Sequence, residues 1–441
     1  MGPVDGPFSR EGSPLRRFTV DVAAALPGPS WLRARREAAA ERFAALELPT
    51  EAEEVWRYSR IDALDLEAYE PVGDEVEAAA DGTLPAALEQ VLAAVGPCAA
   101  VVLVRNGRLA RVDVDPAAAA KGLQVADVAD LDDGDDLLGQ LAGGGHDAFG
   151  ELNAAFLRGA TVVRVPAGVE VDGTVAVLSW IDGDGMAVFP RTIVDAGADS
   201  GVSVVEHVGS PDVGAFVDPV VELNLGDAAR VRYTNVQDLG PRVWQVGYQV
   251  SEVGRDATLR STAVALGGDY ARVRTDSRIT GQGGTSYLNA AYFADGERMH
   301  DFRTLQDHAG PSSTSDLLFK GAVQDRGQSV YSGLIRVGKP ARGTNAFQTN
   351  RNLVLSEGAG ASSVPNLEID TDDVRCSHAS AVGPIDEDQR YYLESRGVPS
   401  AVAEQLIVLG FLGEVLDRLP TPALVSRVRS AVAARLAAGR S

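Results

Sequence analysis

The spacing of apolar residues changes twice along the chain, and each change marks a predicted domain boundary. Apolar side chains recur at helical spacing over residues 30–46, where Ser30 is the expected N-cap, and over 85–95. Helical spacing returns near the carboxyl end, where Gly and Pro residues delimit the expected helices at 386–396, 401–419 and 422–438. The pattern predicts an N-terminal helical domain at 1–96 and a C-terminal helical domain at 383–441.

Between these domains, residues 97–382 alternate short β-branched runs with Gly, Asp and Asn turns, and helical spacing is almost absent. Glycines recur in this region at intervals of 29, 29, 28, 27, 29 and 28 residues, at Gly168, Gly197, Gly226, Gly254, Gly281, Gly310 and Gly338. A fixed period of this length is typical of a solenoid or a propeller. Strands with glycine corners favour a parallel β-helix, so the fold is predicted to be mainly β. A β-sandwich or a propeller is the alternative.

Composition and charge narrow the classes of function. The 441 residues carry a formal net charge of −22, which repels nucleic acid. No stretch approaches the roughly 18–20 apolar residues that a membrane helix needs. The first five residues, Met1–Asp5, lack the basic and apolar regions of a signal peptide, and two cysteines far apart make no disulfide framework. We therefore expect a cytoplasmic chain that binds neither nucleic acid nor membrane.

One short segment combines rare residues whose chemistry suits a metal. Cys376, one of two cysteines, stands two positions before His378, one of five histidines. In a strand both side chains would point to the same face, and a thiolate beside an imidazole suits a soft metal or an iron–sulfur species. Two ligands do not fill a coordination sphere, which indicates a partner. The alternatives are a buried structural cysteine with a structural histidine, or a thiol–imidazole hydrolase.

Two other motifs carry less weight. The segment Gly333–Lys339 fits the phosphate-loop spacing, but Pro340 stands where Ser or Thr must reach magnesium and no helix is expected to follow. We therefore expect no ATP site in this chain. His300 and His308 share a face of a strand, yet lie some ~25 Å apart if fully extended, too far to share a metal. They are expected to satisfy local hydrogen bonds.

Several segments together resemble one family, the SufD proteins of iron–sulfur cluster assembly. The segments are Trp56–Ser59, His300 with His308, Ser329–Ile335, Gln348–Ser356, Leu367–Ile369, Asp372–His378 and Val382–Gly397. The resemblance implies a right-handed parallel β-helix flanked by helical domains. It also implies a non-catalytic scaffold that acts with the paralogue SufB and the ABC-type ATPase SufC, with a homodimer as an option for the chain alone.

The resemblance also assigns residues. It implies that His378 and Cys376 lie near the contact with SufB, where an iron–sulfur cluster forms transiently, and that the histidine matters more than the cysteine. It implies that the contact with SufC lies in the C-terminal helical region at about residues 386–419. The residues expected on that face are Asp386, Gln389, Tyr391, Tyr392 and Arg396.

Three alternatives to this hypothesis are a SufB-like scaffold, a stabiliser of SufB without a ligand role, and a stand-alone β-helix enzyme acting on carbohydrate.

Overall fold

The structure of the chain is a computed structural model that describes residues 15–73, 83–143 and 147–439. Residues 1–14, on which the expectation about a signal peptide rests, lie outside these ranges. Within them, no helix combines the length and the apolar character that crossing a lipid bilayer requires.

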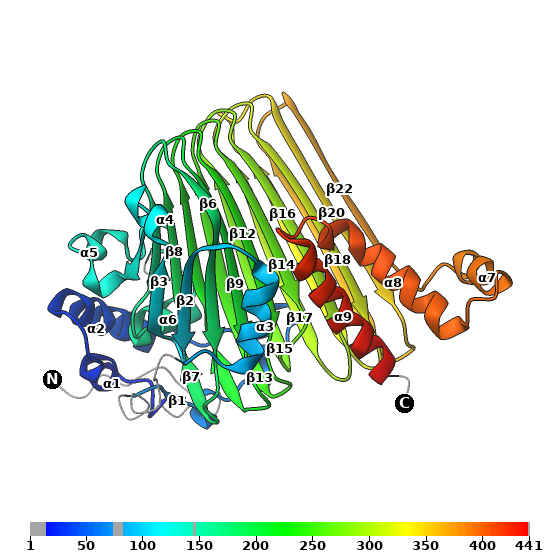
Figure 1. Cartoon of the computed structure of the whole chain (residues 1–441), viewed down its shortest axis with the longest axis horizontal. Helices are drawn as coiled ribbons and strands as arrows, with labels where there is room; N and C mark the ends of the chain where they lie inside the picture. The colour runs from blue at the N-terminus through cyan, green and yellow to red at the C-terminus, as the bar shows by residue number, and fades with distance from the viewer. Residues whose placement is uncertain (1–14, 74–82, 144–146, 440–441) are drawn as a thin grey trace.

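The centre of the molecule is a parallel β-solenoid of about eight turns, which confirms the predicted fold class (Figure 1). Two sheets face each other, and the chain alternates between them. The first sheet contains β4 (Gln124–Asp127), β5 (Thr161–Val165), β8 (Arg191–Ala196), β11 (Val220–Leu225), β13 (Val243–Val253), β15 (Tyr270–Ile279), β17 (Met299–His308), β19 (Gln328–Val337) and β21 (Gly360–Ile369), in that order. The short strands β1 (Glu70–Pro71), β7 (Met186–Val188) and β10 (Ala215–Val217) extend its side.

The second sheet has the same stacked construction. Its order is β3 (Arg108–Val114), β2 (Cys98–Arg105), β6 (Glu170–Trp180), β9 (Gly201–Gly209), β12 (Arg230–Asp238), β14 (Thr258–Ala265), β16 (Thr285–Ala294), β18 (Thr314–Val323), β20 (Thr344–Val354) and β22 (Val374–Gly383). Among the described residues the pairings are parallel except at the N-terminal end, where β2 with β3 and β4 with β5 are antiparallel.

The recurrent glycines lie at successive corners, each where the chain leaves the first sheet for the second. Each corner rests directly on the one before. A Cβ atom at Gly281 would overlap the backbone of Arg255, and one at Gly310 would overlap the carbonyl of Gly281. Two residues after Gly226 and Gly254, the backbone takes a left-handed conformation, and Ala228 there donates its N–H to Arg255 in the next corner at 2.7 Å. The predicted period therefore reflects close stacking of corners.

Coils stack in register, so each side chain lies above its counterpart one coil earlier. Ala346 of β20 pairs with Ser315 of β18 and Cys376 of β22, for example. Inside the solenoid, the coils near the N-terminus carry an apolar cluster rich in valine. Later coils carry hydrogen-bonded polar groups across the interior, such as Ser277 to Ser286 at 2.7 Å. In-register stacking therefore makes every interior residue a neighbour of the residues above and below it.

His300 and His308 lie in this interior, and both are fully buried. The Nε2 atom of His300 lies 3.2 Å from the carbonyl oxygen of Phe293. The ring nitrogens of His308 lie 2.8 Å from the hydroxyls of Ser313 and of Ser315. These contacts confirm the expectation that the pair satisfies local hydrogen bonds.

Helices cover the solenoid at both ends of the sequence. The described N-terminal part contributes α1 (Val20–Ala25), α2 (Ser30–Ala44) and α3 (Ala86–Val95), with 3₁₀ turns at Glu54–Trp56, Ile61–Ala63, Leu66–Ala68 and Val128–Asp130. The C-terminal part contributes α7 (Glu387–Ser395), α8 (Ser400–Leu416) and α9 (Pro422–Ala438). These positions confirm the expected helices. The expected N-cap is wrong, because Pro29 occupies the cap position of α2 and Ser30 is its first residue.

Three short helices interrupt the region in which we expected strands and turns. They are α4 (Pro116–Ala120), α5 (Gly134–Leu137) and α6 (Ala148–Phe156). Asp147 caps α6 through hydrogen bonds to the N–H groups of Phe149 and Gly150, and the helix packs against α2. The domain limits at residues 96/97 and 382/383 stay a prediction.

The segment around Trp56 is fixed to the outer face of the first sheet by buried charges. Arg272 lies over the Trp56 ring at 3.7 Å and donates to the carbonyl of Val55. Asp301, fully buried, accepts hydrogen bonds from both Arg272 and Arg303. Burial raises the pKa of the Asp301 carboxyl, but these two arginines outweigh it and leave the pKa below the ordinary value. These contacts give Trp56, Arg272 and Arg303 structural roles.

We expect Gly281→Ala to lower the free energy of unfolding by about 1–3 kcal/mol, because the added methyl group forces two stacked corners apart. The midpoint of urea denaturation measures the change. Gly410→Ala is the matched control, since a Cβ at that helical position meets open space. Equal midpoints for the two variants would contradict the stacking of corners.

Because three histidines are buried, we expect the folded chain to lose stability in acid. Burial lowers the pKa of His207, His300 and His308 to about 4, below the ordinary value near 6.5. Their contribution to stability is therefore complete above pH 6.5 and is lost as the pH falls toward 4. The thermal midpoint should fall over this window, and the fall should be shallower in His300→Gln/His308→Gln. An unchanged slope in the double variant would show that these imidazoles do not protonate on unfolding.

Candidate functional site

The last coil of the solenoid forms an open end. Strands β21 and β22 are the terminal strands of their sheets, so each pairs on one side only within the described chain. The interior-facing side chains of this coil are consequently exposed: Leu367 is 37% exposed, Ile369 40% and Val382 45%. An unpaired strand edge with apolar side chains is a surface on which another strand can add.

Cys376 and His378 both lie on β22, on the side that faces the interior. Their register partners one coil earlier, Ala346 and Gln348, are buried, whereas Phe347 between them is exposed. The structure therefore brings the thiol and the imidazole to one face, at the open end. His378 is exposed and Cys376 is partly buried against a small cluster formed by Ile335, Val337, Ala341 and Ala346.

The thiol of Cys376 is a weak nucleophile in this setting. Burial raises its pKa, and a hydrogen bond with the backbone of Ala346 offsets only part of the effect. The thiol is therefore protonated at neutral pH. The imidazole of His378, by contrast, is exposed to solvent. Among the described residues, no group of three or more His, Cys, Asp and Glu side chains is arranged to hold a metal ion. This chain therefore offers at most a pair of ligands here.

The residues expected to bind the ATPase lie on and beside α7, which projects away from the solenoid (Figure 1). Asp386 caps this helix by accepting hydrogen bonds from the N–H groups of Asp388 and Gln389. Tyr391 and Tyr392 are 72% and 58% exposed, and the guanidinium of Arg396 lies 5.2 Å from the Tyr392 ring centroid. None of the described residues of α7 is buried, and its exposed side is available for contacts, whereas its other side packs against α8.

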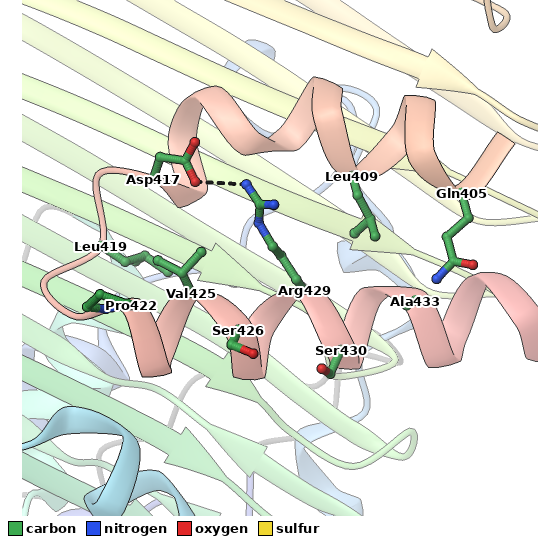
Figure 2. Close-up of a pocket in the computed structure, with 10 residues that line it drawn as sticks. All are labelled: Gln405, Leu409, Asp417, Leu419, Pro422, Val425, Ser426, Arg429, Ser430 and Ala433. Carbon is green, nitrogen blue, oxygen red and sulfur yellow. Dashed lines mark hydrogen bonds and ion pairs between the residues drawn. The ribbon is translucent and has the colours of Figure 1, made fainter. Parts of the chain in front are cut away.

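Helices α8 and α9 line an open groove of about 700 Å³ that the sequence did not reveal (Figure 2). Leu409, Leu419 and Val425 form part of its apolar wall, and an ion pair of 2.8 Å between Arg429 and Asp417 crosses it. Helical spacing alone predicted a helix over residues 401–419. It could not tell which side of that helix faces the solenoid and which side faces α9.

The segment Gly333–Pro340 runs from β19 into a turn and then into β20. The helix that a phosphate loop requires does not follow it, and its first glycine faces the interior beside Gln348. The interpretation of this segment as a false match is therefore confirmed.

Comparison with known proteins agrees with this geometry. The model of the SufBD core domain of the SUF system for iron–sulfur cluster assembly matches residues 179–411, more than half of the chain. A SufBD family protein of iron–sulfur cluster assembly from Mycobacterium tuberculosis is 36% identical over 296 residues, which cover 65% of this chain and 72% of the relative.

Two relatives carry the name SufD. The iron–sulfur cluster assembly protein SufD of Bacillus subtilis is 31% identical over 287 residues, covering 64% of this chain and 65% of the relative. Its namesake in Escherichia coli is 30% identical over 250 residues, covering 56% and 59%. The matched core domain contains the solenoid from the end of β6 to the open end, together with Cys376, His378 and α7. The chain belongs to the SufBD family of iron–sulfur cluster assembly proteins.

Proposed function

We propose that this chain is the SufD-like scaffold subunit of a complex that builds iron–sulfur clusters, and that His378 is its ligand to iron or to the nascent cluster. The observation that carries the proposal is the position of His378. It is an exposed imidazole on the interior face of the terminal coil, at an unpaired strand edge. Cys376 is a secondary ligand, because its partly buried thiol must lose a proton first.

A paralogous solenoid of the SufB type is the partner proposed for the open end. The irons of a cluster need several ligands, and Cys376 with His378 supplies two. A second chain that adds its own strands to β21 and β22 would provide the others and would cover Leu367, Ile369 and Val382. Full burial of an exposed side chain of this size is worth roughly 1.5–3 kcal/mol, so covering the exposed 37–45% of these three is worth about 1 kcal/mol each and supports association at this edge.

A SufC-like ABC ATPase is the second proposed partner, and α7 is its proposed docking site. A surface helix without buried residues gains little from folding onto its own chain. Tyr391, Tyr392 and Arg396 are residue types that dominate binding energy at protein interfaces. In this arrangement the ATPase would supply the nucleotide chemistry and this chain would itself be non-catalytic.

Family membership supports cluster assembly over the carbohydrate-active alternative. The SufD names of two relatives favour a SufD-like role over a SufB-like one. A chain that only stabilises its paralogue would not need an exposed histidine at the open end, and the first experiment below separates that case.

We expect His378→Ala to reduce the yield of iron–sulfur cluster in the reconstituted complex at least tenfold, because the imidazole ligand is lost. Cys376→Ser should retain most of the yield. Iron and sulfide analysis measures both, after the variants have been co-purified with the paralogue and the ATPase in wild-type ratios. A wild-type cluster yield from His378→Ala would reject the ligand role and leave the purely stabilising role.

We expect Tyr391→Ala/Tyr392→Ala to weaken binding of the ATPase at least tenfold, since truncation of exposed aromatic anchors costs on the order of 2 kcal/mol or more. Isothermal titration of the chain with the ATPase gives the affinity. Thermal stability should not change, because neither side chain is buried. The control Val55→Ala removes a side chain of similar exposure from the N-terminal segment. Equal affinities of the two variants would exclude α7 as the docking site.

A further inference from the structure

Gln348 is a buried polar side chain whose hydrogen bonds are not all made within the described part of the chain. It is 1% exposed, and its Oε1 has no hydrogen-bond partner among the described residues. A buried carboxamide without a full set of hydrogen bonds lowers the free energy of unfolding, and such groups are rare in folded proteins. Its presence therefore calls for a specific reason.

The environment of Gln348 leaves few groups that could satisfy it. In its own strand the neighbouring interior residues are Ala346, which is apolar, and Asn350, whose amide already bonds Tyr292 and Asn352. One coil earlier its register partner is Leu317. Across the interior it faces Gly333, where a Cβ would overlap both the Gln348 Nε2 and the Tyr331 hydroxyl. The Tyr331 hydroxyl therefore lies beside Nε2 and interacts with the amide, which leaves Oε1 as the atom without a partner.

The remaining register partner is His378, one coil later. Residues paired between parallel strands point their side chains the same way, with strands about 4.8 Å apart. The imidazole of His378 is exposed at the open end and is free to rotate toward the interior. A shift of about 2 Å between the two side chains closes that strand spacing to hydrogen-bonding distance.

The geometry points to Gln348 as the positioning residue of His378, with the carboxamide Oε1 accepting a hydrogen bond from one ring nitrogen of the imidazole. The other ring nitrogen is then deprotonated and directed to the open edge. A histidine that binds metal needs this arrangement, since its second nitrogen must keep its proton and find an acceptor. The inference about the hydrogen bond stands alone; its meaning for iron binding rests on the proposed function of His378.

The experiment measures the tautomer of His378 in the full chain. The ring ¹⁵N shifts of histidine-labelled protein, assigned with His378→Ala and recorded at one alkaline pH, give the ratio of the two neutral tautomers. In Gln348→Leu this ratio should change about fivefold relative to the wild type, the effect of one net hydrogen bond. Gln348→Glu keeps an acceptor at this position and should keep the wild-type preference.

The matched control is Gln324→Leu. Gln324 is also a buried glutamine with an unpartnered Oε1, but it follows β18, which lies two strands away from β22 and His378 in the same sheet. This variant should leave the tautomer ratio unchanged. Gln348→Leu should fold, because leucine removes an unsatisfied amide and replaces it with a side chain of similar volume.

Two outcomes overturn the inference: an identical tautomer ratio in the wild type and Gln348→Leu, or the same change in Gln324→Leu. The result is independent of cluster assembly. If His378→Ala leaves cluster yield intact while Gln348→Leu shifts the tautomer, the ligand role fails and the positioning contact stands. If His378→Ala abolishes assembly and the tautomer does not respond to Gln348, only the positioning role fails.

Discussion

In-register stacking of one coil on the next is the constraint on which the rest of this structure depends. Because the strands are parallel and paired residue for residue, every interior position belongs to a column that runs along the solenoid. The corners must approach closely for this to happen, which is why glycine recurs where the chain leaves the first sheet. The same stacking buries polar groups such as His300 and Asp301 at fixed places and obliges them to find partners within one coil.

Stacking also explains why the last coil is the end of the solenoid that is left open. Each interior residue of a column is covered by the coils before and after it, except in the last coil. There the strand edge is unpaired and the interior side chains are exposed. His378, Leu367 and Val382 are ordinary interior positions that have no coil above them. In our account the family uses this unfinished end as half of a site, to be completed by a second solenoid.

Features that depend on residues close together in the chain could be predicted from the sequence. Glycine spacing predicted the solenoid, and capping residues together with Gly397 and Pro420 located α7 and α8 to within three residues. The N-cap assigned to Ser30 failed because Pro29 is equally compatible with a helix start. Helix α6 was missed although Asp147 is a good cap, since a nine-residue helix inside a strand-rich region gives little periodicity.

The features that depend on register could not be predicted. Nothing in the sequence distinguishes Gln348 from other polar residues of a strand until its neighbours above, below and across are known. The same is true of the groove between α8 and α9, which depends on how two apolar helices meet. Cys376 and His378 were found because their types are rare, but their exposure at the open end follows only from the topology.

Hydrogen–deuterium exchange of the chain, alone and with its SufB-like paralogue, tests the central claim most directly. The account predicts that backbone amides of Gly360–Ile369 and Val374–Gly383 gain protection when the partner binds, while amides of the internal strand Arg230–Asp238 do not change. Protection gained elsewhere, with the two terminal strands exchanging as fast as in the free chain, would contradict the open end as the site of assembly.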